Sequence, residues 1–147
     1  MFRGRYQHAI DSKGRVSLPS KFRDILSNLG DDRLIITTNF DGNLVAYTQL
    51  EWQNLENRLN KLPQLNPHVI RFKRFFISGA TECPIDKTGR VLIPPVLREH
   101  AQIEKEIIFA GMITHIEIWA RERWEKEYEV ARVGMDDTIK ALAELGF

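Results

Sequence analysis

Two short motifs hold the side chains with the clearest capacity for chemistry. In each, an aspartate precedes an arginine by four positions: Asp11 and Arg15 in the first motif, Asp86 and Arg90 in the second. An arginine presents a planar fork of N–H donors that fits a phosphate group or the O6 and N7 atoms of guanine. The aspartate can orient that fork through a salt bridge, or it can shape the turn and pair with the arginine locally. The motifs therefore predict a nucleic-acid ligand, with the arginine as the contacting group.

Further basic residues accompany the first motif. Residues 1–24 contain six basic and two acidic side chains, a net charge of +4, whereas residues 121–147 contain five basic and seven acidic ones, a net charge of −2. A basic N-terminal module suits a polyanion. The strand from Arg5 is expected to run antiparallel to the strand after the motif, which would bring its basic residues beside the turn. The predicted DNA contacts are Arg3, Arg5, Lys13, Arg15, Lys21, Lys87 and Arg90. For Arg3, Arg5 and Lys21 the alternative is ordinary surface charge.

The second motif lies in a less basic module. Lys87, Arg90 and Arg98 occupy matching places there, but Glu82, Glu99, Glu104 and Glu106 are close in sequence. We therefore expect the second copy to be mainly structural or to make a weaker DNA contact.

Signatures of other chemistries are missing from the sequence. It has no Gly-x-Ser-x-Gly, no glycine-rich phosphate loop and no His-Glu-x-x-His, and its histidines lack metal-ligand spacing with Cys83 or with one another. We expect no enzyme, no metal, no cofactor and no small-molecule substrate. No apolar run approaches the roughly 18 residues of a membrane span, and one unpaired cysteine suits a reducing compartment. The prediction is a cytoplasmic protein without a membrane partner.

The two motifs belong to an internal repeat. The segment Asp11-Ser-Lys-Gly-Arg-Val-Ser-Leu-Pro19 recurs as Asp86-Lys-Thr-Gly-Arg-Val-Leu-Ile-Pro94, and Trp52 recurs downstream as Trp124. Each copy predicts a strand, a turn, a second strand, a helix opened by the proline and a hairpin. In the turns, Gly14 and Gly89 permit a positive φ, and Asp11 and Asp86 bond their own backbone. The hairpins are expected around Asp41-Gly42 in the first copy and around Gly111 in the second.

These elements predict a mainly β fold with short flanking helices, of the α+β class. We assign residues 5–52 to the first domain, 53–80 to a helical linker, 81–124 to the second domain and 125–147 to a C-terminal helical tail. Thr48 and Glu51 form a capping box, and Pro67 can open a linker helix. In the tail, Ile139, Leu142 and Leu145 predict an interaction helix or a cap between subunits.

Each copy is too small to bury a sufficient core alone. Domains below roughly 60 residues are only marginally stable unless disulfides, a metal or association with another domain stabilise them, and no disulfide framework is present. We therefore expect the two copies to interleave their hairpins into one pseudo-symmetric barrel, and chains to associate.

The opening Met1-Phe2-Arg3-Gly4, the two Asp-x-x-Gly-Arg motifs and the Trp-containing helices resemble the MraZ family. The resemblance covers nearly the whole chain in the right order and spacing. It implies two tandem AbrB-like swapped-hairpin modules in a cytoplasmic, nucleoid-associated regulator of transcription. It also implies a ring-like homo-oligomer that binds direct repeats in double-stranded DNA upstream of the operon for cell division and cell-wall synthesis.

Two other functions fit parts of the sequence. The first is a protein-interaction module, like the antitoxins that share this small fold and neutralise a partner through a tail. Its discriminating feature is the helix predicted in residues 135–147. The second is a small hydrolase, which would require a pocket with perturbed carboxylates.

Overall fold

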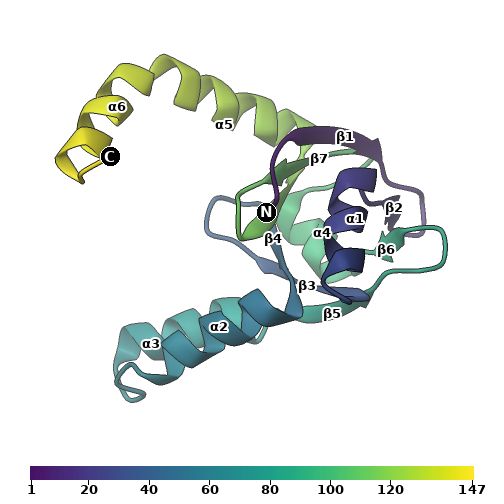
Figure 1. Ribbon diagram of the computed structural model, residues 1–147, viewed down its shortest axis with the longest axis horizontal. Coiled ribbons are helices and arrows are strands. Elements are labelled where there is room, and N and C mark those ends of the chain that lie inside the picture. Colours follow the sequence, from purple (N-terminus) through teal and green to yellow (C-terminus); the bar gives the residue numbers. More distant parts are fainter.

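Both repeats fold into the same series of elements in the computed structural model, which describes residues 1–147 (Figure 1). The first repeat forms β1 (Arg5–Ala9), β2 (Arg15–Ser17), α1 (Ser20–Asn28), β3 (Arg33–Thr38), β4 (Leu44–Tyr47) and α2 (Gln49–Asn60). The second forms β5 (Thr81–Pro84), β6 (Arg90–Leu92), α4 (Pro95–Ala101), β7 (Glu106–Gly111), β8 (His115–Ala120) and α5 (Arg121–Val133). Between them lie α3 (Pro67–Phe72) and a π-helical turn, η1 (Lys73–Ile77), and α6 (Met135–Glu144) follows α5.

Local signals account for most element boundaries. The Thr48 side chain caps α2 by accepting a hydrogen bond from the backbone N–H of Glu51 (3.2 Å), which confirms the predicted cap. Pro67 stands in the first turn of α3, as expected. The second hairpin differs from the prediction, because Gly111 is the last residue of β7 and the turn follows at 112–114. Ile113 takes a φ of 70° there, a conformation that a glycine would adopt more easily.

Six strands form one antiparallel sheet in the order β1-β7-β8-β4-β3-β5. The copies exchange their outer strands: β1 of the first repeat pairs with β7, and β5 of the second pairs with β3. Each repeat therefore completes the sheet of the other. The expected closed barrel is not formed, because β1 and β5 remain the edges of an open sheet. The short strands β2 and β6 pair only with each other as a separate two-stranded ribbon.

The core lies between the sheet, the ribbon and helices α1 and α4. Val16 and Val91, at the centre of the ribbon, are buried on its inner side. The fully buried ring of Phe22 meets Phe2 and Tyr6 edge-on, with ring centroids 5.3 and 5.2 Å apart. Burying a phenylalanine of this kind contributes about 1.5–3 kcal/mol. These contacts hold α1 against the N-terminal segment and β1.

Two helical arms extend from the outer face of the sheet, on the same side of the molecule (Figure 1). The first arm, α2–α3–η1, packs through Trp52 and Phe76, whose rings stack at 5.7 Å, onto Ile35 and Val45. The C-terminal arm, α5–α6, begins where Trp124 meets Trp119 of β8, with ring centroids at 6.0 Å. None of these helices is both long and apolar enough to cross a membrane. The arms leave the opposite end of the molecule, where the ribbon turns lie, uncovered.

Candidate nucleic-acid interface

The first turn is organised around the carboxylate of Asp11. Its Oδ1 atom accepts hydrogen bonds from the backbone N–H groups of Lys13 and Arg15, both at 2.9 Å. Its Oδ2 atom accepts from Arg15 Nε, also at 2.9 Å. Asp11 therefore shapes the turn and orients the arginine at once. The guanidinium uses only Nε in this contact, so its two Nη groups remain available for a ligand.

The second turn repeats this arrangement. Asp86 Oδ1 accepts from the backbone N–H groups of Thr88 and Arg90, both at 2.9 Å, and Oδ2 accepts from Arg90 Nε at 3.1 Å. Thr88 adds a hydroxyl donor to Oδ1 at 2.8 Å. The backbone hydrogen bond from Arg90 is the main reason that the pKa of Asp86 falls to about 2, and the same bond from Arg15 lowers the pKa of Asp11. Both aspartates thus stay ionised and keep their arginines oriented.

The ribbon places both arginines on one surface. In its register Arg15 lies opposite Leu92, and Ser17 lies opposite Arg90, with Val16 opposite Val91 between them. Side chains alternate along a strand, and the two valines face the core. The outer face therefore carries both arginines in a pseudo-twofold arrangement. Strand spacing and rise put their Cα atoms on the order of 8 Å apart.

Each turn is completed by an arginine from the other repeat. Arg98 of α4 lies against Gly14, with its Nε donating to the carbonyl of Ile93 at 2.9 Å. Arg23 of α1 lies against Gly89, and its Nη1 approaches the carbonyl of Thr88 at 3.4 Å. The Nε of Arg23 is buried without a hydrogen-bond partner.

Both glycines are required by this packing. Gly14 and Gly89 have φ values of 87° and 80°, and a Cβ at Gly14 would lie 2.9 Å from Arg98 Cζ.

Neither Arg23 nor Arg98 forms a salt bridge within the chain. An arginine without a carboxylate partner adds positive charge to each turn.

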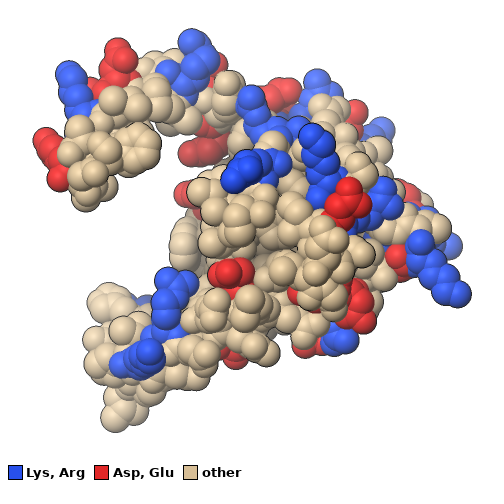
Figure 2. All heavy atoms as spheres, in the orientation of Figure 1, with Lys and Arg blue, Asp and Glu red and all other residues tan.

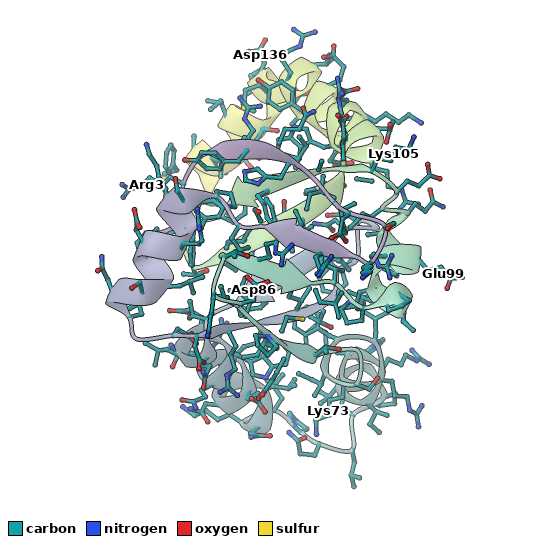
Figure 3. All side chains as sticks on the ribbon, turned by 90° about the vertical axis from the view of Figure 1, so that its right-hand side faces the viewer. Arg3, Lys73, Asp86, Glu99, Lys105 and Asp136 are labelled. Carbon is teal, nitrogen blue, oxygen red and sulfur yellow. The ribbon has the colours of Figure 1, made fainter.

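The other predicted contacts are distributed differently. Lys13 and Lys87 are exposed at the tips of the two turns. Arg3 and Lys21 line a shared hollow beside α1 with Tyr6 and Phe22. Figure 2 shows blue side chains extending from the turn end, and Figure 3, viewed from that end, labels Arg3 toward one edge and Asp86 nearer the middle.

Arg5 does not lie beside the first turn. Strand β1 pairs with β7 and not with β2, and Arg5 is at its far end from the turn. The Arg5 guanidinium carbon instead lies 4.5 Å from the ring centroid of Tyr128 and 5.9 Å from that of Trp124. A cation above an aromatic face is an attractive contact. Arg5 therefore packs β1 against α5.

Comparison with known proteins agrees with these motifs. The MraZ family model, described as "MraZ protein, putative antitoxin-like", matches residues 1–75 and 76–140. The chain belongs to the MraZ family. Among curated relatives, the transcriptional regulator MraZ of Alkaliphilus metalliredigens is 46% identical over 146 residues, covering 99% of both chains. The proteins of the same name from Thermoanaerobacter pseudethanolicus and Clostridium acetobutylicum are 46% and 47% identical, again over 99% of both chains. A transcriptional regulator is not a class of enzyme.

Two arginines at these turns were not predicted from the sequence. Arg23 is one of the six basic residues of positions 1–24, and Arg98 was expected beside the second motif, whereas each lies against the turn of the opposite repeat. The partners are far apart in sequence, 65 positions for Arg23 and Thr88. A signal was nevertheless present, because each arginine follows the proline of its own motif by four residues. No group of three or more His, Cys, Asp or Glu side chains in the structure is placed to hold a metal ion.

Proposed function

We propose that this chain is a sequence-specific DNA-binding transcriptional regulator that reads duplex DNA with the outer face of the β2–β6 ribbon. The observation that carries the proposal is the pair Arg15 and Arg90, each fixed by its aspartate through Nε with both Nη groups free. The major groove of B-DNA admits a two-stranded β-ribbon, and a bidentate arginine on guanine is the commonest specific contact there. A guanidinium group that is already oriented loses little further conformational freedom on binding DNA.

Surrounding cations supply the contacts to the phosphate backbone. Lys13 and Lys87 at the turn tips and Arg23 and Arg98 at the glycines flank the ribbon on both sides. Arg3 and Lys21 extend the basic surface from α1 and the N-terminus. Phosphate contacts position a protein on DNA without reading its sequence. The second repeat contributes equally to this surface, since its Arg90 is held as Arg15 is.

One ribbon offers few contacts, so we propose that binding is multivalent. In the MraZ manner, a ring-like homo-oligomer would engage direct repeats upstream of the operon for cell division and cell-wall synthesis, on the nucleoid in the cytoplasm. Linked weak contacts gain affinity when their spacing fits the sites. Each neutralised phosphate adds about −0.9 to the slope of log affinity against log salt. A multi-repeat site should therefore show a steeper slope than a single repeat.

The test uses DNA selected by the protein itself from a random duplex pool, and the DNA upstream of its own gene. Selected sequences should contain guanine at fixed positions, and affinity should fall when half a helical turn is inserted between repeats. If the protein enriches no sequence from the pool, specific reading is contradicted. If it binds one repeat as tightly as the array of repeats, multivalent binding is contradicted.

The alternative is an antitoxin-like interaction module that does not read DNA specifically. The exposed apolar residues of the C-terminal arm, among them Ile139 of α6 and Leu145 directly after it, favour a protein contact through this arm. Deleting residues 135–147 separates the two functions. A DNA-reading ribbon should keep its contact with a single repeat after the deletion, whereas an interaction module should lose its partner.

A further inference from the structure

The two ends of the β2–β6 ribbon differ, although each carries an arginine. The strands are antiparallel, so each end combines the turn of one repeat with a residue from the other repeat. At the end beside the first turn (the first-turn end), Arg15 lies opposite Leu92. At the end beside the second turn (the second-turn end), Arg90 lies opposite Ser17. Leu92 and Ser17 occupy matching positions of the repeat, so the outer face is symmetric in its arginines and asymmetric in the residues beside them.

Leu92 and Ser17 suit different base edges. Both side chains are exposed, Leu92 by 52%. The thymine methyl group is the apolar feature of the major groove, whereas a serine hydroxyl donates or accepts and tolerates several bases. Opposite side chains of a ribbon have Cβ atoms about 4.5–5.5 Å apart, and successive base pairs are about 3.4 Å apart. The first-turn end therefore favours a guanine with a thymine beside it, and the second-turn end favours a guanine without that thymine.

Phosphate contacts do not distinguish one orientation of the ribbon from the other. They carry no sequence information, and the two backbones of a duplex exchange places after a half-turn about a twofold axis. The ends do differ in charge, since Lys21 of α1 corresponds to Val96 of α4. Figure 3 shows Arg3 and α1 on one side of the ribbon and Glu99, in α4, on the other. This difference affects how tightly DNA is held, and the choice of orientation is left to the base contacts.

We propose that Leu92 and Ser17 set the orientation of each chain on DNA, because they make the site of one ribbon a short non-palindromic sequence. Leu92 meets a thymine methyl group beside the guanine that Arg15 reads. In the reversed orientation Ser17 takes this place and the apolar contact is lost. Burial of one methyl group corresponds to about a fourfold preference, so about four in five complexes face one way. This rests on the proposed function, since the same ribbon must read DNA.

The experiment maps which side of one selected repeat is cut by a cleavage reagent tethered to the full chain. An iron chelate is attached at Ser20→Cys, an exposed position at the start of α1. Helix α1 lies against the second turn through Arg23, so the reagent marks the second-turn end. The native Cys83 is buried, and the chain without Ser20→Cys gives the background. An assembly of several copies reverses as one body, so a reversal mirrors the pattern of cuts whatever the number of copies.

Three variants of the labelled chain separate base contacts from phosphate contacts. Ser17→Leu combined with Leu92→Ser exchanges the two ends and should mirror the cuts on the same duplex. Leu92→Ser alone makes the ends alike and should give equal cutting on both sides. The matched control, Lys21→Val combined with Val96→Lys, moves a cation to the other end and should leave the cut side unchanged. All these positions are exposed, and circular dichroism should show every variant folded.

Four results would overturn the proposal. They are equal cutting on both sides by the unmodified ribbon, an unchanged cut side after the Ser17–Leu92 exchange, loss of specific binding by that folded variant, and mirrored cuts after the Lys21–Val96 exchange. Failure of the proposed function gives a different result, because a chain that does not read DNA enriches no sequence from the pool, and the orientation then falls with it. Specific binding with equal cutting would keep the proposed function and reject the orientation.

Discussion

Replacing Arg15 with alanine should separate DNA binding from stability. The Arg15–Asp11 salt bridge joins two side chains that are each 38% exposed, and such exposed pairs contribute about 0.2–1 kcal/mol. The backbone hydrogen bonds to Asp11 Oδ1 do not involve the arginine side chain, so the turn should persist. Since 1 kcal/mol shifts the melting temperature of a chain of this size by about 2–4 °C, the Tm should fall by less than about 4 °C.

The free-energy cost to DNA binding should be larger than the cost to stability. A bidentate arginine–guanine contact discriminates by about 1–3 kcal/mol, which corresponds to about 5- to 150-fold in Kd for one ribbon. An oligomer that uses several ribbons multiplies the loss. Arg15→Lys keeps the charge but not the planar fork. It should retain salt-dependent binding while losing preference for the selected sequence.

The assay is fluorescence anisotropy with the selected duplex and with a scrambled duplex of the same length. Arg33→Ala serves as the matched control, because Arg33 is also a half-exposed arginine paired with carboxylates, those of Asp32 and Glu82. It should change binding only slightly. If Arg15→Ala melts normally and binds the selected duplex as tightly as the unmodified protein, Arg15 is not the reading residue and the reasoning fails.

Three further predictions concern the turns and the ribbon. Gly14→Ala should lower stability by at least about 1 kcal/mol, since φ is 87° and the new Cβ would lie 2.9 Å from the carbonyl of Ile93; an unchanged Tm would contradict this. The pKa of Asp86 is lowered to about 2 from an ordinary 3.8, so its ionised form stabilises the fold above about pH 4, and this contribution is lost between about pH 4 and pH 2. The difference in Tm between pH 5 and pH 2.5 should therefore be smaller for Asp86→Asn than for the unmodified chain. Leu92, 52% exposed on the ribbon's outer face, should contact a thymine methyl group, so duplexes with uracil in place of thymine should bind more weakly, and Leu92→Ala should abolish that difference.

Most of the local structure could be predicted from the sequence. The two turns were expected because aspartate, glycine and arginine lie within five residues of one another, and the aspartate satisfies its own backbone. The helices after Pro19 and Pro94 followed from the fixed φ of proline. The π-helical turn at residues 73–77 had no signal in the aromatic spacing, and the second hairpin turned at residues 112–114, directly after the glycine expected in the turn.

The sequence by itself determined that the chain has two equivalent motifs and that each aspartate holds an arginine, because these interactions span four residues. Only the tertiary structure decided which strands pair, and hence what surrounds each motif. The pairing of β2 with β6 set Arg23 and Arg98 against the opposite turns, and the pairing of β1 with β7 accompanies the packing of Arg5 on Tyr128. The sheet is open, with β1 and β5 at its edges, and β2 and β6 pair separately from it. Pairing of distant strands depends on burying one shared core, and that depends on all residues of both repeats together.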